Sequence, residues 1–260
     1  RSPDPTFSVI MPVHDGAEQL EQALAALCTS EYRDYEVIVV DDGSTESLEP
    51  VVARHGFRWL RLDRQGGPAR ARNHGATTAK GKILLFIDSD VCIHPDTLAR
   101  IAEAFAADPA IDAVVGTYDD APADPRFLSQ YKNLFHHYTH VNSPGRIETF
   151  WSGCGAIRRE CFAAFGGFDE VRYRAPAIED VELGTWMTCA GRRIVLDPLV
   201  RCKHLKRWTL FNLLWTDIFE RGIPWTHLIH RSGVMPGTLN VRRQERVCVA
   251  LIWVALLSLA

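Results

Sequence analysis

Short apolar runs alternate with stretches of helical periodicity along the first half of the chain. Residues 7–13, 36–40 and 83–87 are almost purely apolar, as strands buried on both faces of a sheet are. Residues 17–28 place leucines at helical spacing, and residues 68–79 begin with proline after two glycines, as many helices do. Strands that alternate with helices are joined by crossover connections. The pattern therefore predicts an α/β fold with a mostly parallel, Rossmann-like sheet covered by helices on both faces. The other predicted elements are strands at 57–62 and 113–115 and helices at 48–55 and 97–107.

The second half of the chain is less regular. Its pattern predicts a helix at 178–190, a short strand at 194–196, and a long aromatic-rich helical stretch at 209–230 that a glycine and a proline interrupt. The predicted organisation is one domain at 1–205, with halves at about 7–116 and 117–205, then amphipathic helices at 206–245 and the start of a membrane helix at 246–260.

The membrane prediction depends on the last residues of the sequence. Residues 247–260 carry no charge and follow arginines at positions 242, 243 and 246. A helix needs about 20 apolar residues to cross a bilayer, so this run is too short by itself. It predicts a membrane helix that begins here with arginines on its cytoplasmic side, and hence a protein at the cytoplasmic face of a membrane. The aromatic-rich stretch before it suits a helix at the membrane interface. Buried helices, one terminal and one packed over a substrate cleft, are the alternatives.

Composition narrows the function classes. The 260 residues are 47% hydrophobic and 23% charged, which is typical of a globular protein and excludes disorder and coiled coil. Lys and Arg number 29 and Asp and Glu 32, so a net charge of −3 gives no overall basic field for nucleic acid. The seven cysteines form no C-x-x-C pair, which argues against a structural zinc site and a disulfide framework.

Carboxylates follow three of the predicted strands. Asp15 comes shortly after the first strand, Asp42 after the second, and Asp88-Ser89-Asp90 directly after the fourth. Ligands of open α/β sheets bind at the carboxyl ends of the strands, so we expect these side chains to share one site. Each alone is also typical of a helix cap or a turn. Two carboxylates together with diphosphate oxygens are ligands that Mg²⁺ and Mn²⁺ prefer.

Six segments stand in a fixed order along the chain: SVIMPVHD, VIVVDDGS, GGPARARNHGA, ILLFIDSDV, the GCGAIRRE–FGGFDE stretch, and Ile-Glu-Asp at 178–180. As a set they resemble the inverting glycosyltransferases of family 2, which have the GT-A fold. The resemblance extends over about residues 7–204. It implies a hexosyltransferase-type enzyme that transfers a sugar from a nucleotide diphosphate-sugar to a saccharide or lipid-linked acceptor. It also implies Mn²⁺ or Mg²⁺ as cofactor, which would offset the charge of the departing diphosphate.

Carried over position by position, the resemblance implies a donor site. Asp90 would be the direct metal ligand, and Asp88 would hold the ribose or the water shell of the metal. His204 would be a further metal ligand, with an ordinary packed histidine as the alternative. Lys206 and Arg207 would close over the diphosphate. The implied nucleotide-sugar-binding residues are Pro12, Val13, Asp15, Asp42, Arg72, Asp88, Ser89 and Asp90.

The acceptor side is implied by Glu179 and Asp180, which match the acidic catalytic pair of the family. Asp180 is the candidate general base, which takes the proton of the acceptor hydroxyl as its oxygen attacks the anomeric carbon opposite the diphosphate. A carboxylate that only favours a helix N-terminus is the alternative. If the acceptor were an ionised lipid phosphate, Asp180 would position it without deprotonating it. The residues expected at the sugar or acceptor, with core packing or a tight turn as alternatives, are Trp151, Gly153, Cys154 and Gly155.

Two rival functions are weighed against single transfer. Processive polysaccharide synthases of this family have Q-x-x-R-W where this chain has His at position 204, followed by Leu-Lys-Arg-Trp. The exchange of Gln for His favours one sugar per encounter. A catalytically inactive GT-A binding module would not need the intact acidic set. The sequence leaves the nucleobase, the sugar and the acceptor open, because these depend on pocket shape.

Overall fold

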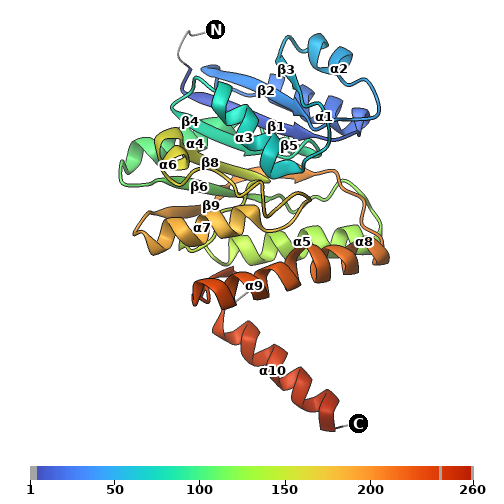
Figure 1. Ribbon diagram of the computed structural model, residues 1–260, viewed down its shortest axis with the longest axis vertical. Coiled ribbons are helices and arrows are strands. Elements are labelled where there is room, and N and C mark those ends of the chain that lie inside the picture. The colour runs from blue at the N-terminus through green and yellow to red at the C-terminus, as the bar shows by residue number, and fades with distance from the viewer. Residues whose placement is uncertain (1–4, 240–241, 259–260) are drawn as a thin grey trace.

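The computed structural model describes residues 5–239 and 242–258 of the chain. Its strands are β1 (Phe7–Val13), β2 (Tyr35–Asp41), β3 (Arg58–Arg61), β4 (Ile83–Ile87), β5 (Val91–Ile93), β6 (Ala113–Tyr118), β7 (Gly145–Ile147), β8 (Cys154–Arg158) and β9 (Ile194–His204). Within the described residues they form one sheet in the order β3-β2-β1-β4-β8-β6-β9-β5, with β7 paired to β9 (Figure 1).

Helices pack on both faces of this sheet, as predicted. They are α1 (Ala17–Cys28), α2 (Glu49–Arg54), α3 (Pro68–Thr78), α4 (Thr97–Ala107), α5 (Phe127–Val141), α6 (Arg159–Ala164), α7 (Glu179–Cys189), α8 (Leu210–Trp215), η1 (Thr216–Gly222), α9 (Ile223–Ser232) and α10 (Arg243–Ser258). Successive side chains of a strand point to opposite faces, so Val9 belongs to one apolar core and Ile10 to the other. The first core is covered by α1, α2 and α4, and the second by α3, α6 and α7.

The first half of the sheet is parallel and the second half is mixed. The strands β3, β2, β1 and β4 run parallel, because crossover helices connect them. In contrast, β8 runs antiparallel to both of its neighbours, β4 and β6. The predicted parallel arrangement therefore holds for the first half, and the second half departs from it. The strand order reverses between β1 and β4, which is where open α/β sheets bind ligands.

The strand β9 is longer than the strand predicted at 194–196. Its register against β6 shifts around Pro198, which has no N–H to give to the sheet. Beyond this irregularity β9 continues to His204, which pairs with Val91 of the edge strand β5. The continuation brings His204 next to the turn that follows β4.

The C-terminal helices differ in part from the prediction. The elements α8, η1 and α9 follow one another without a break, so Gly222 and Pro224 do not interrupt them. The π-helical geometry of η1 takes up the irregularity before the proline. The helix α10 extends away from the sheet (Figure 1). In the described part of the chain, no helix has the length and apolar character needed to cross a membrane. Three features stay predictions: the membrane helix at 246–260, the interfacial helices at 206–245 and the cytoplasmic-face location. The last two residues of that membrane helix lie outside the described ones.

Candidate active site

Two carboxylates tie together the loops that follow the first three strands: Asp15 joins the loops after β1 and β2, and Asp42 joins the loop after β2 to the start of α3. Asp15 has a φ of 59°, and its Oδ1 accepts hydrogen bonds from the N–H and the hydroxyl of Thr45 at 2.8 and 3.0 Å. The Thr45 N–H is the main cause that lowers the pKa of Asp15. Asp42 accepts hydrogen bonds from the N–H groups of Gly66 and Gly67 at 2.9 and 2.7 Å, although burial still raises its pKa. The amides that open α3 are therefore already bonded to a carboxylate of the chain itself.

Three further donor-site candidates lie at the same edge of the sheet. Pro12 and Val13 are buried at the end of β1. Ser89 is half-buried in the turn that joins β4 to β5. The structure places all three at the carboxyl ends of parallel strands, and their contact with a nucleotide stays a prediction.

Arg72 joins the two halves of the domain. It is 4% exposed on α3, and its Nη2 lies 2.6 Å from Asp88 Oδ1 while its Nη1 lies 2.7 Å from Glu179 Oε1. Burial lowers the pKa of Arg72, but the two carboxylates outweigh burial and raise it. Desolvation raises the pKa of Asp88 and of Glu179 in spite of the guanidinium. Arg72, predicted near the nucleotide, is thus committed to positioning one carboxylate on each side of the site.

Asp90 and His204 lie together, as metal ligands would. Asp90 Oδ2 is 3.3 Å from His204 Nε2. His204 Nδ1 lies 2.8 Å from the side-chain oxygen of Asn133, and its Nε2 faces Asp90. Desolvation raises the pKa of Asp90, but His204 and Lys206 outweigh it and hold the pKa below its usual value. The His204 ring also stacks on Tyr118 at a centroid distance of 4.5 Å.

These donors fit a divalent cation in part. A carboxylate oxygen and an imidazole nitrogen suit Mn²⁺, and the asparagine on the other ring nitrogen orients the imidazole as partners of metal-bound histidines do. Among the residues that the structure describes, no group of three or more His, Cys, Asp or Glu side chains is arranged to hold a metal ion. A cation here would take its other ligands from diphosphate oxygens and water, as is usual at phosphate sites.

Asp180 lies at the beginning of α7 and is half-buried. Its Oδ2 accepts hydrogen bonds from the N–H and the hydroxyl of Ser152 at 2.8 and 2.9 Å. The neighbouring Glu179 is 4% exposed and paired with Arg72. Of the predicted catalytic pair, Asp180 is therefore the carboxylate that remains accessible, whereas Glu179 holds the arginine.

The small residues before and within β8 are explained by packing. The Trp151 ring packs against Tyr118 of β6 and two histidines of α5. A Cβ at Gly153 would lie 2.6 Å from the Trp151 ring, and one at Gly155 would lie 2.2 Å from the Trp151 carbonyl oxygen. Cys154 is fully buried in β8. The contacts of these four residues with a sugar or acceptor stay predictions. Because Cys154 and Gly155 are buried, the structure does not support such contacts for these two.

Two basic residues follow β9. Lys206 lies with its ammonium 4.5 Å from the centre of the Trp208 ring and close enough to Asp90 to lower the pKa of that carboxyl. Arg207 is exposed. The structure places Lys206 beside the candidate metal ligands, where a diphosphate would be held, and the diphosphate contact of both residues stays a prediction.

Two residues of the site were not predicted. Asn133 belongs to α5, a helix that the sequence pattern did not reveal, and no sequence signal links it to His204, which is 71 positions away. Ser152 precedes two glycines, and glycines in a loop indicate close approach of the backbone and not a side-chain hydrogen bond. A hydroxyl directly before a strand and opposite a helix N-terminus is the signal that would have found it.

Burial behind the site lowers the pKa of two histidines of α5, His136 and His140, and makes both sensitive to acid. His140 of α5 is 5% exposed, and its Nδ1 lies 2.9 Å from the carbonyl oxygen of Gly116. Burial is the main cause that lowers the pKa of His140 to about 4. The unfolded chain binds a proton at about pH 6.5, so the folded state loses stability as pH falls from about 6.5 towards 4.

We expect His140→Asn, which keeps a donor for Gly116 but does not titrate, to lack this part of the acid sensitivity. The parent should lose up to about 3 kcal/mol of unfolding free energy through this residue over that range. Urea unfolding of both proteins at pH 7 and pH 4.5 measures the difference. Equal acid losses in parent and variant would contradict the assignment.

The fold defines the class of protein. Among solved structures, the mannosyltransferase PcManGT from Pyrobaculum calidifontis in complex with GDP-Man and Mn²⁺ aligns with a TM-score of 0.64 at 24% sequence identity. The alignment covers 81% of this chain and 59% of that chain. The mixed sheet and its two helical layers are thus the GT-A fold.

Sequence comparisons then give the family. The model of glycosyl transferase family 2 matches residues 8–166, and the chain belongs to this family. The O-antigen biosynthesis protein RfbC of Myxococcus xanthus is 32% identical over 173 residues, which are 64% of this chain and 13% of RfbC. The poly-beta-1,6-N-acetyl-D-glucosamine synthase of Staphylococcus epidermidis is 26% identical over 193 residues, which are 70% of this chain and 42% of the synthase. The chain thus spans less than half the length of these two relatives.

Proposed function

We propose that the protein transfers one sugar per encounter from a nucleotide diphosphate-sugar to an acceptor hydroxyl, with inversion and with a divalent metal. The observation that carries this proposal is the bridge made by Arg72. The guanidinium holds Asp88, which belongs to the same turn as Asp90, against Glu179, which adjoins Asp180. A donor-side carboxylate cluster and an acceptor-side carboxylate thereby face one site.

The residues of the site would have separate roles in such a transfer. Asp90 and His204 would hold the cation, which when bound offsets negative charge on the departing diphosphate. Lys206 adds a positive charge beside Asp90. Asp180, oriented by Ser152, would accept the proton of the acceptor hydroxyl as the new glycosidic bond forms. The leaving diphosphate departs on the opposite face, so the configuration inverts.

Single transfer is supported by the contacts of His204. This residue stands where processive synthases of the family have the Gln of Q-x-x-R-W, and here it lies against Asp90 and Asn133. A glutamine would not supply the imidazole nitrogen that faces Asp90. We therefore place this chain with the enzymes that release their product after each transfer.

We expect one nucleoside diphosphate among UDP, GDP, dTDP and CDP to stabilise the folded protein only when Mn²⁺ is present. A ligand at 100 times its Kd stabilises by about 2.7 kcal/mol, which for a protein of this size raises the Tm by roughly 5–10 °C. Asp90→Ala should lose the metal-dependent part of the shift, because it removes the proposed carboxylate ligand. A thermal-shift screen with and without Mn²⁺ measures both.

The matched control is Glu103→Ala, which removes an exposed carboxylate of α4 and should leave the shift unchanged. Release of the diphosphate from the corresponding nucleotide-sugar, with a saccharide or lipid-linked acceptor, then separates an enzyme from a binding module. The proposal fails if the folded protein responds to none of the four nucleotides, or if the Asp90 variant keeps the metal-dependent shift.

A further inference from the structure

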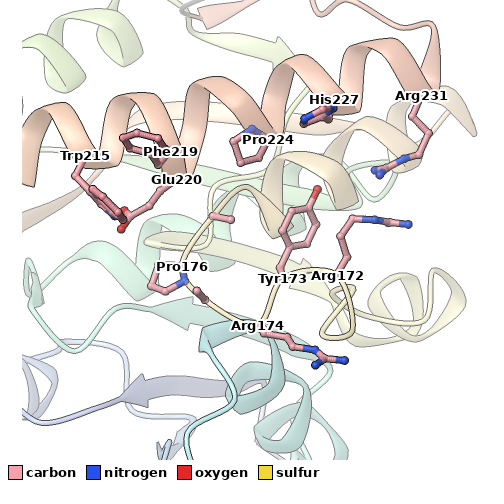
Figure 2. Close-up of a pocket in the computed structure, with 12 residues that line it drawn as sticks. Arg172, Tyr173, Arg174, Pro176, Trp215, Phe219, Glu220, Pro224, His227 and Arg231 are labelled. Atoms are coloured by element: carbon pink, nitrogen blue, oxygen red, sulfur yellow. The ribbon is translucent and has the colours of Figure 1, made fainter.

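A cavity of about 790 Å³ lies between the loop that precedes α7 and the continuous helix of η1 and α9 (Figure 2). This volume is within the range of small-molecule sites, roughly 300–1,000 Å³. All of its lining residues fall within 172–231, beyond the part of the chain that the family model matches. The cavity therefore lies outside the segment by which the family is recognised.

One end of the cavity is basic. Arg172 and Arg231 both bond to Oε1 of the buried Glu182, at 3.0 and 2.6 Å, while the Tyr173 hydroxyl donates to Oε2 at 2.5 Å. The arginine side chains remain 45% and 36% exposed. Arg172 Nη1 also pairs with Asp169, so Glu182 and Asp169 both anchor this arginine. Each guanidinium has five N–H donors, so these anchors fix its position and leave other N–H groups for a ligand. Figure 2 shows both arginines at the same end of the cavity.

Arg174 adds a further positive charge on the same loop. Its Nε donates to the Val171 carbonyl, and within the described residues no carboxylate lies within ion-pair distance of its guanidinium. The acidic residue that lines the cavity is Glu220, which Figure 2 shows beside Trp215 at the other end. Charge therefore changes along the cavity, and an anion is favoured at the arginine end.

Apart from Glu220, the opposite end is apolar and open to solvent. Trp215 and Phe219 are 48% and 52% exposed, and their ring centroids lie 4.7 Å apart. Pro176 and Pro224 line the cavity with them. The same helical stretch carries further exposed apolar side chains, at Phe211, Leu214 and Ile218. An apolar chain that leaves the cavity would find a continuous apolar path along this helix.

The cavity adjoins the proposed catalytic carboxylates. Its loop packs on the start of α3, because a Cβ at Gly67 would lie 2.6 Å from the Arg174 carbonyl oxygen. The last lining residue of the loop, Ala177, donates its N–H to Glu179 Oε2 at 3.2 Å, directly before Asp180. A ligand in the cavity therefore lies beside the acceptor side of the site.

We propose that this cavity binds the acceptor, and that the acceptor carries a phosphate-like anion joined to an apolar chain. That the ligand is an acceptor rests on the proposed sugar transfer. The chemistry of the ligand is inferred from the cavity alone. The anion lies on Arg172 and Arg231, with Arg174 adding positive charge from the same loop, and the chain lies along Trp215 and Phe219. The anion serves as a handle away from the reacting hydroxyl, so Asp180 still has a proton to remove.

Isothermal titration calorimetry on the full chain, without metal or nucleotide, tests this assignment. The probes are dodecyl phosphate, dodecyl maltoside and inorganic phosphate. The two dodecyl compounds are kept below the concentration at which they form micelles. Dodecyl phosphate should bind at least tenfold more tightly than either of the others. Arg231→Gln should weaken dodecyl phosphate about tenfold, because a charge-assisted hydrogen bond is lost while Arg172 and Tyr173 still bond to Glu182. Phe219→Ala should weaken it about fivefold through lost apolar contact.

Two matched variants serve as controls. Arg54→Gln alters an exposed arginine on α2, and Leu210→Ala an exposed apolar residue of α8 that does not line the cavity; both should bind as the parent does. Equal affinity for dodecyl maltoside would overturn the anionic end, and equal affinity for inorganic phosphate would overturn the apolar chain. Parent-like binding in both cavity variants would place the ligand elsewhere. A parallel titration with Mn²⁺ and the nucleotide reports on the proposed transfer alone, so a failure of either idea is seen separately.

Discussion

Asp180→Asn is expected to lower kcat for sugar transfer by about 10²–10⁴-fold and to leave the Kd for the Mn²⁺–nucleotide complex unchanged. The carboxylate is the accessible basic group at the acceptor side, since Glu179 is buried and committed to Arg72. Asparagine keeps the volume but cannot accept the proton. Steady-state release of the nucleoside diphosphate measures kcat, and calorimetry measures the Kd.

A control variant at Ser152 distinguishes a general base from a carboxylate that only holds the local structure. Ser152→Ala removes a hydroxyl that donates to Asp180 at 2.9 Å but leaves the carboxylate and the backbone N–H bond in place. It should therefore retain at least about a tenth of kcat, because an ordinary hydrogen bond contributes about 1 kcal/mol. If both variants lost activity equally, Asp180 would act by holding the segment before β8, and its role as base would be refuted.

The parallel half of the sheet could be predicted because local pattern and tertiary structure agree there. The apolar runs that became β1, β2 and β4 are buried on both faces, and a helix with regular apolar spacing separates the first two. The carboxylates after these strands followed from the same pattern, since the carboxyl ends of parallel strands meet at one edge. The positions of Asp42 and Asp90 at this edge are therefore predictable from the sequence.

The helix α5 could not be predicted because its polarity is inverted. It buries Ser129, Asn133 and His140 and exposes Phe127 and Tyr131, at 79% and 51%. An apolar stripe is expected to mark the buried face of a helix, so the periodicity of this segment points the wrong way. The polar face is buried because it holds His204 and the segment before α8, which only the tertiary structure reveals.

Contacts between segments far apart in the chain could not be predicted from the sequence either. Arg72 and Glu179 are 107 positions apart, and Glu182 and Arg231 are 49 apart. Each ion pair depends on how the irregular loop before α7 folds over α3, and no periodicity describes that loop. The motifs at both ends of the Arg72 bridge were recognised, but not that they bind each other.

Arg72→Met is expected to lower the free energy of unfolding by about 3–5 kcal/mol, the second large effect that the structure predicts. Methionine fills much of the space of the arginine, so the loss comes mainly from charge. Asp88 and Glu179 would each lose their guanidinium partner, and Glu179 is 4% exposed. Urea unfolding at pH 7.5, followed by fluorescence and by circular dichroism, measures the change.

The pH dependence of the Arg72→Met variant separates lost charge pairing from lost packing. Burial already raises the pKa of Glu179 above its ordinary value of 4.5, and removal of the guanidinium raises it further. The folded variant then holds a proton that the unfolded chain releases, so its stability falls as pH rises above about 4.5, and its deficit against the parent narrows towards acid. Adding Glu179→Gln to Arg72→Met should recover part of the loss at pH 7.5, because it removes the unpaired buried charge. A deficit that is the same at pH 5.5 and 7.5, with no recovery in the double variant, would mean that Arg72 stabilises the domain by packing alone.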